Sequence, residues 1–397
     1  EPKVDYMRIF ILVFLFFYML NALTLDEIIT SALEKNPSLE VINERINANS
    51  YLIDSSDSLS NPELSVTTNT LDSSEPMSQT IISIKQKIPY LAKLTNKKEL
   101  SKAQEGVLFS SLEKAKSTLV YEIKKTAYKI WELNAIYKTL QSNEKLILKS
   151  IELFEAYTSV NNNQHIDMME AELSLIELKV QKSELKSQID SMFTVLSYLC
   201  ASDIDTLDVS LNISQVPTRE SLQNLLVNNP DLNLKTKEIQ KQNANVKLSD
   251  ANIYPDFVLN GGYSIRSEFD NYFNIGVGIT LPIYGVESSK HEQQQKLLLS
   301  QKAQKKDLQI DIQNRFNSYY IQMQNAYDNY KIINDEALAH IKHMLDISYA
   351  STSTGTNLLK QIKILQKKLK LEQKRIDAIS LYNINYAKIL QLSGATK

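Results

Sequence analysis

The chain has 397 residues, enough for two halves of about 200 residues each and more than one ordinary hydrophobic core requires. Its formal net charge is −2, and lysines alternate with acidic residues along the same segments, so nothing in it favours nucleic-acid binding. It has one cysteine, Cys200, which excludes an intramolecular disulfide.

The first segment, residues 1–22, predicts a secretory signal peptide. A positively charged flank precedes an unbroken apolar run at 9–20, and Ala22 supplies the small residue expected at a cleavage site. The apolar run is shorter than the roughly 20 residues of a membrane-spanning helix, which disfavours the alternative of a membrane anchor. Met7 is a candidate for the true start residue, with 1–6 as upstream sequence.

Six prolines recur in pairs at a constant offset of 193 residues. The pairs are Pro37 and Pro230, Pro62 and Pro255, and Pro89 and Pro282. An asparagine precedes the proline at both members of the first pair, so the local sequence agrees as well. An offset without gaps predicts one structural unit written twice, over 23–201 and 218–397, with 202–217 as a linker.

Each half is expected to contain two short helices, then two strands, then a long helical hairpin. A change to a two-residue period of apolar side chains predicts strands at 63–71, 80–88, 256–265 and 272–281. These strands have the length that a tilted strand needs to cross a bilayer.

The helical hairpins are predicted at 92–200 and 286–392. Apolar residues recur in them every seven residues, which indicates that the helices pack on other helices and supercoil. In the first half the outgoing helix runs to about residue 157, and in the second half it runs to about residue 349. A helix of some 65 residues would be roughly 100 Å long.

Four strands per chain leave two interpretations of the β part. One is a soluble sheet with one face packed on helices. The other is a membrane sheet, and open edges in lipid would then leave backbone groups unsatisfied. Several chains sharing their strands would close those edges, and their long helices would form the wall of a tube.

Several local patterns carry a resemblance to a known family. They are "ALEKNPSLE" and "LLVNNPDLN" before the second helices, "NPELSV" and "YPDFVL" entering the strands, and "GVGITLPIY" leaving them. Together with the order of elements, these resemble the TolC family of outer-membrane efflux proteins over essentially the whole mature chain. The resemblance implies a mainly α fold with a small transmembrane β part. It implies a homotrimer whose chains complete a 12-stranded barrel in outer-membrane lipid of a Gram-negative bacterium, continued by a long α-helical periplasmic barrel.

The resemblance also implies a function. The chain would be the outer-membrane channel of a tripartite efflux system and would passively conduct drugs, toxic compounds or metal ions. Its partners would be a periplasmic adaptor and an inner-membrane pump. The alternatives are the duct of a type I protein secretion system and a non-pore periplasmic coiled-coil protein. No phosphate loop, nucleophile elbow or paired-carboxylate site appears, so neither an enzyme nor a cofactor is expected.

Family members commonly carry rings of acidic residues early in the return helices, where the tunnel narrows. At the family's spacing the first half has Asp167 and Glu170, whereas the second half has Lys360 and Lys363. These four residues are candidates for a pore gate held by ion pairs between helices. The alternative is that they are ordinary solvated charges near a helix end.

His340 and His343 lie three residues apart on a predicted helix, a spacing that can bind a metal ion. Neither a cysteine nor a third histidine accompanies them, so no metal site is expected there.

Overall fold

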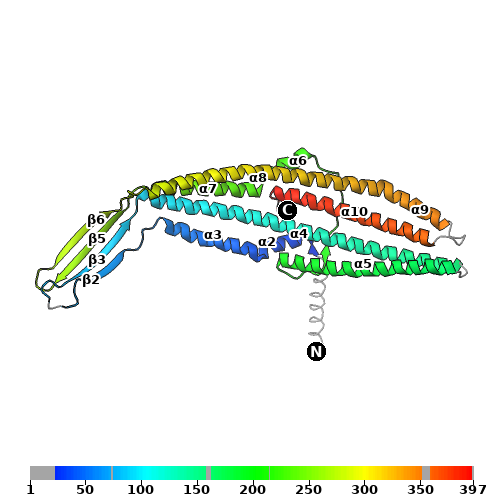
Figure 1. Cartoon of the computed structure of the whole chain (residues 1–397), viewed down its shortest axis with the longest axis horizontal. Coiled ribbons are helices and arrows are strands. Elements are labelled where there is room, and N and C mark those ends of the chain that lie inside the picture. Colours follow the sequence, from blue (N-terminus) through cyan, green and yellow to red (C-terminus); the bar gives the residue numbers. More distant parts are fainter. Residues whose placement is uncertain (1–22, 73–74, 158–161, 214, 351–357, 396–397) are drawn as a thin grey trace, which may run out of the picture. The chain divides into compact units, whose positions relative to one another are not determined.

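The computed structural model describes residues 23–72, 75–157, 162–213, 215–350 and 358–395 (Figure 1). The signal segment predicted at 1–22 lies outside these residues, as do 158–161 and 351–357, between the long helices. The chain is mainly helical with one four-stranded sheet, so the predicted fold class is confirmed at this level. It divides into two units, which we call the helical unit and the sheet unit. The helical unit takes its described residues from Glu1–Leu39, Ala115–Asn229 and Gln313–Lys397, and the sheet unit from Glu40–Lys114 and Pro230–Ile312.

The first half of the chain begins with a capped helix. Thr24 accepts a hydrogen bond from the backbone N–H of Glu27, whose carboxylate accepts in return from Thr24, which satisfies two free donors of the first turn. The elements are β1 (Leu23–Thr24), α2 (Leu25–Lys35), α3 (Pro37–Ser56), β2 (Glu63–Thr68), β3 (Gln79–Ile88), α4 (Leu91–Tyr157) and α5 (Asn162–Cys200).

The second half follows the same order of main elements. Pro230 opens its second helix just as Pro37 opens α3, a position where the missing N–H of proline costs no hydrogen bond. The elements are β4 (Leu207–Asp208), α6 (Arg219–Asn224), η1 (Leu225–Asn228), α7 (Pro230–Ala251), β5 (Phe257–Arg266), β6 (Tyr272–Ile279), α8 (Val286–Lys331), η2 (Ile332–Ala337), α9 (Leu338–Ala350) and α10 (Leu358–Leu392).

The sheet unit carries the four-stranded sheet, in the order β2-β3-β5-β6 with every neighbouring pair antiparallel (Figure 1). The central pairing of β3 with β5 joins the two halves of the chain over ten registered residue pairs, from Gln79 opposite Arg266 to Ile88 opposite Phe257. Strands β2 and β6 are the outer strands of this sheet.

The helical unit is held together by buried side chains of α4, α5, α9 and α10. One cluster places Leu140 and Ile147 of α4 against Leu175 of α5 and against Ile362 and Leu365 of α10. A second cluster surrounds Phe316 and Met323 of α8 and includes Tyr382 and Ile389 of α10. Helix α10 therefore contributes to both clusters, which fixes one of its faces against the rest of this unit.

The outgoing helix of the second half differs from the prediction. It was expected to be continuous over 286–349, but a π-helical turn at Ile332–Ala337 separates α8 from α9. The buried residues Ile333 and Ile341 are eight positions apart, whereas Leu140 and Ile147 of α4 are seven apart. A π-helical turn accommodates one extra residue, so both isoleucines still reach the core.

Smaller differences concern the ends of elements. Strands β2 and β6 end at Thr68 and Ile279, a few residues before the predicted ends at 71 and 281. The two-residue parallel pairing of β1 with β4 was not predicted, since two residues are too few to show a period.

Candidate functional site

The sheet has one apolar face that is shared by all four strands. Because the strands pair in register, alternate residues of each strand fall on the same side. This face is largely open to solvent in the single chain: Ile275 is 89% exposed, Phe273 81% and Leu64 73%. Its residues are Leu64, Val66, Ile82, Ile84, Ile88, Phe257, Leu259, Tyr263, Phe273, Ile275, Val277 and Ile279. An uncovered apolar face of this extent marks a surface that contacts lipid or another protein.

The opposite face of the sheet is polar. The hydroxyl groups of Ser65 and Ser83 lie 2.9 Å apart across β2 and β3. Glu63 lies 3.8 Å from the ammonium group of Lys85 and 3.5 Å from that of Lys87. A sheet with one apolar and one polar face is typical of a barrel whose outside contacts lipid and whose inside contacts water.

On this polar face two asparagine side chains lie over the glycines that they pair with on the neighbouring strand. Asn260 pairs with Gly276 across β5 and β6, and Asn274 pairs with Gly262. A Cβ added at Gly276 would lie 2.2 Å from Oδ1 of Asn260, and one added at Gly262 would lie 2.6 Å from Oδ1 of Asn274. Glycine is therefore required at both positions for the asparagine side chains to lie flat along the sheet.

The sheet has two open edges. Within the part of the chain that the structure describes, neither the outer side of β2 nor that of β6 pairs with another strand. Each edge exposes a row of backbone N–H and C=O groups that can pair with a further strand.

Asp256, directly before β5, ties strand ends to helix in the sheet unit. Its Oδ1 accepts hydrogen bonds from the backbone N–H of Tyr90 at 3.0 Å and from Nζ of Lys93 at 2.7 Å. The rings of Tyr90 and Tyr254 pack beside it, with centroids 4.9 Å apart. In the sequence this aspartate is part of the pattern "YPDFVL", which does not predict its hydrogen bonds to Tyr90 and Lys93. A carboxylate immediately after Tyr-Pro was the available signal.

The four predicted gate residues lie near the beginnings of α5 and α10, in the helical unit. Asp167 is half-buried, and Glu170, Lys360 and Lys363 are exposed. The two helices are neighbours just beyond these residues, because Nε2 of Gln366 donates to Oγ of Ser174 at 3.2 Å. Among the described residues of the single chain, no ion pair joins the two acidic residues to the two lysines.

His340 and His343 lie on α9. In the described part of the chain, no group of three or more His, Cys, Asp or Glu side chains is placed to hold a metal ion. Cys200 is buried at the end of α5, and this burial raises the pKa of its thiol to about 11, so the thiol is unreactive at neutral pH.

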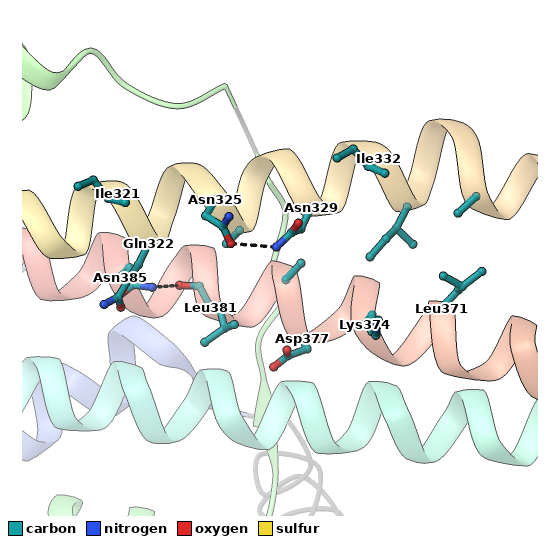
Figure 2. Close-up of a pocket in the computed structure, with 14 residues that line it drawn as sticks. Ile321, Gln322, Asn325, Asn329, Ile332, Leu371, Lys374, Asp377, Leu381 and Asn385 are labelled. Carbon is teal, nitrogen blue, oxygen red and sulfur yellow. Dashed lines mark hydrogen bonds between the residues drawn. The ribbon is translucent and has the colours of Figure 1, made fainter.

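The helical unit has a cavity of 690 Å³ in the groove between α8–η2 and α10 (Figure 2). Asn325 and Asn329 line it from α8, and Lys374, Asp377 and Asn385 line it from α10. The pKa of Asp377 is raised, chiefly by burial and also by Glu132 of α4, while Lys129 of α4 opposes the rise. The sequence does not predict this cavity, because its walls come from segments that are far apart in the chain.

No helix in the described residues combines the length and the apolar composition needed to cross a membrane.

Comparison with known proteins places the chain among outer-membrane channels in fold. Residues 221–381 match the family model described as outer membrane efflux protein. The structure is similar to the Campylobacter jejuni CmeC outer membrane channel (TM-score 0.77, 13% identity, covering 93% of this chain and 85% of that one). It is also similar to the open state of the Neisseria gonorrhoeae MtrE outer membrane channel (TM-score 0.77, 13% identity, 94% and 89% covered).

A third similar structure is the outer membrane protein VceC of Vibrio cholerae (TM-score 0.75, 15% identity, 94% and 97% covered). At such low identities the structural similarity establishes the fold alone. The family match adds a similarity in sequence over residues 221–381, in the second half of the chain. The resemblance drawn from the sequence is thus confirmed. No curated protein sequence matches the chain.

Proposed function

We propose that this chain, whose residues 221–381 match the outer membrane efflux protein family, is one protomer of the outer-membrane channel of a tripartite efflux system. Small molecules would pass through it from a periplasmic adaptor and an inner-membrane pump to the outside of a Gram-negative cell. It would act as a passive conduit, with neither a catalytic site nor a cofactor.

The observation that carries this proposal is the sheet with one apolar face and two open edges. In the described part of the chain, the backbone groups on the outer sides of β2 and β6 have no strand partner, and much of the apolar face is exposed. In lipid each unsatisfied backbone group costs several kcal/mol, so only a closed barrel is stable there. Three copies joined edge to edge, β6 of one against β2 of the next, would close a 12-stranded barrel.

A row of exposed apolar residues on α5 supports assembly through the helices as well. Its members follow a spacing of three and four residues, which puts them on one helix face. Leu173 is 59% exposed and Ile166 57%. The full row is Ile166, Met169, Leu173, Ile176 and Val180. Such a row is the seam by which one helix packs on another, and a helix of a second copy would cover it.

We also propose that the two halves are a tandem structural repeat, 23–201 and 218–397 with the linker 202–217 between them. Asn36 donates from Nδ2 to the carbonyl oxygen of Leu199 at 2.7 Å, and Asn229 donates in the same way to Leu392 at 2.8 Å. Both partners of the second bond follow those of the first by 193 residues. The same tie at the same offset supports equal helix lengths in the two halves, as a shared tunnel wall requires.

We propose a pore gate at the periplasmic end of the channel. In a trimer, Asp167 and Glu170 of α5 would face Lys360 and Lys363 of α10 across helix boundaries and would narrow the periplasmic end. The adjacency of α5 and α10 at Ser174 and Gln366 supports this arrangement. Solvated charges with no partner are the alternative, and an exposed ion pair contributes only about 0–1 kcal/mol.

The experiment that tests the proposed function is reconstitution. Full-length protein extracted from outer membranes should run as a trimer in mild detergent and should form discrete ion channels in planar bilayers. A monomeric protein that stays in the aqueous fraction and forms no channels would instead support a non-pore coiled-coil protein. A deletion strain would then separate the two kinds of cargo. Loss of dye export would indicate small-molecule efflux, and loss of a secreted polypeptide would indicate protein secretion.

A further inference from the structure

One face of α10 carries a row of five lysines. They are spaced alternately three and four residues apart, so they share one face of the helix and span about 21 Å along it. All five are exposed to solvent in the chain. We call this set the lysine row: Lys360, Lys363, Lys367, Lys370 and Lys374.

The lysine row is offset only in part: Asp377, three residues after Lys374, lines the same cavity. Among the described residues, none of the five ammonium groups takes part in an ion pair, whereas Lys368, on another face of the same helix, lies 3.7 Å from Glu372. Neighbouring like charges on one helix face repel each other. Lys360 also lies in the first turn of α10, where the helix dipole disfavours a positive charge. The row therefore opposes the local stability of its own helix.

The equivalent face of α5 shows that a row of lysines is not imposed by the fold. The positions 193 residues earlier hold Asp167, Glu170, Ser174, Glu177 and Gln181, so three of the five are acidic. The two helices hold the same place in the two halves and carry opposite charge on this face.

The rest of α10 determines where the lysine row can point. Its other faces are packed, because Ile362, Leu365 and Leu369 are buried in the cluster with α4, α5 and α9. The last lysine, Lys374, lines the cavity of 690 Å³ together with Asn385 of the same helix (Figure 2). On the other side the cavity is lined by Asn325 and Asn329 and also by the apolar side chains of Ile321, Ile332 and Ile333. The row therefore lies on the side of α10 that the buried cluster leaves free, and it ends at a recess lined by both polar and apolar side chains.

We infer that the lysine row, and above all Lys367 and Lys370 beyond the proposed gate pairs, lines the aqueous path of the assembled channel and makes it selective for small anionic solutes. This inference rests on the proposed function. Three copies of the row around one axis, held by walls of low dielectric constant, would concentrate anions and repel cations. The cargo class is then small molecules that carry carboxylate, sulfate or phosphate groups.

The test is the reversal potential of single channels in planar bilayers under a KCl gradient. The unaltered protein should pass chloride in preference to potassium. The double variant Lys367→Gln with Lys370→Gln should lower the permeability ratio of chloride to potassium by about twofold or more. Glutamine has a helix propensity close to that of lysine, so α10 should still form. Neither residue belongs to the proposed gate.

The matched control is Lys179→Gln with Lys186→Gln, which removes the same charge from exposed positions on α5, outside the lysine row. It should leave the permeability ratio unchanged. A channel that prefers potassium, or a control that shifts the ratio as much as the row variant, would overturn the inference while the proposed function stands. A protein that forms no channel at all would refute the proposed function and this inference with it.

Discussion

The side-chain amide of Asn229 donates a hydrogen bond of 2.8 Å to the carbonyl oxygen of Leu392, and both residues are almost completely buried. The bond joins the corner before α7 to the last residue of α10. It satisfies a carbonyl group that the end of a helix leaves without an intrahelical partner. The equivalent bond between Asn36 and Leu199 does the same at the end of α5.

Asn229→Ala should therefore destabilise the helical unit. A buried carbonyl group that loses its partner costs about 1–3 kcal/mol, and the truncated side chain leaves a small cavity in addition. The change is measured as a fall in the thermal unfolding midpoint by circular dichroism in detergent. Asn224→Ala, at an exposed position of α6, is the control and should cost much less. Equal effects of the two substitutions would show that the buried hydrogen bond contributes nothing.

Gly276→Ala should reduce assembly of the sheet, because the new methyl group would lie 2.2 Å from Oδ1 of Asn260. Gly278→Ala is the matched control on the same strand and face, where the nearest atom would be Cβ of Val258 at 3.7 Å. The yield of trimer after membrane extraction measures the effect. Adding Asn260→Ala to the Gly276→Ala variant should restore the yield. A Gly276→Ala protein that assembles as well as the Gly278→Ala protein would contradict the steric account.

The gate proposal predicts that Asp167→Asn with Glu170→Gln raises single-channel conductance by about twofold or more, because both changes weaken charge pairs across the narrow end. The control is Glu184→Gln with Asp190→Asn, which removes the same charge from exposed positions further along α5. Unchanged conductance in the first variant would leave these residues as ordinary solvated charges.

Asp377→Asn should stabilise the helical unit at neutral pH. Burial raises the pKa of Asp377 in the folded protein, so the ionised carboxylate is disfavoured there, and stability falls as pH rises from the unfolded pKa, near 3.8, through the raised folded value. Below both values the substitution should make no difference. Lys129 and Glu132 face the carboxylate from α4, and partial exposure to solvent limits the gain to less than about 1 kcal/mol.

Unfolding midpoints of the wild-type and Asp377→Asn proteins measured from pH 3 to pH 8 check this prediction. The curves should separate with increasing pH, with the variant higher. A variant that is less stable at neutral pH would show instead that ionised Asp377 is stabilised, for example by Lys129.

Much of the fold could be predicted from periodicity and proline spacing. Strand β6 was visible in the alternation of Phe273, Ile275 and Val277 with asparagine and glycine, and it forms at Tyr272–Ile279. The helix start at Pro230 was visible in the Asn-Pro pair that it shares with Pro37. These features depend on nearby residues only, so a single sequence shows them.

The π-helical turn at Ile332–Ala337 was not predicted, although a signal existed. The step of eight residues from Ile333 to Ile341 breaks the heptad, but it becomes visible only when these two isoleucines are known to be the buried ones. The cavity beside it and the hydrogen bonds of Asp256 depend on contacts between distant segments, which periodicity does not report. The proposed charge pairs of the gate would form only in the assembled trimer, so neither the sequence nor one protomer shows them.

The central claim is that β2 of one copy pairs with β6 of the next, and cysteine cross-linking in native membranes tests it most directly. The chain's own Cys200 is buried with its pKa raised to about 11, so it gives little background. Two proteins would each carry Ser65→Cys on β2, one with a second cysteine at Asn274 and the other with a second cysteine at Gly278 on β6, to sample the register between copies. We predict that mild oxidation gives covalent dimers and trimers in at least one of these proteins. Monomers alone in every one of them would contradict the closed barrel.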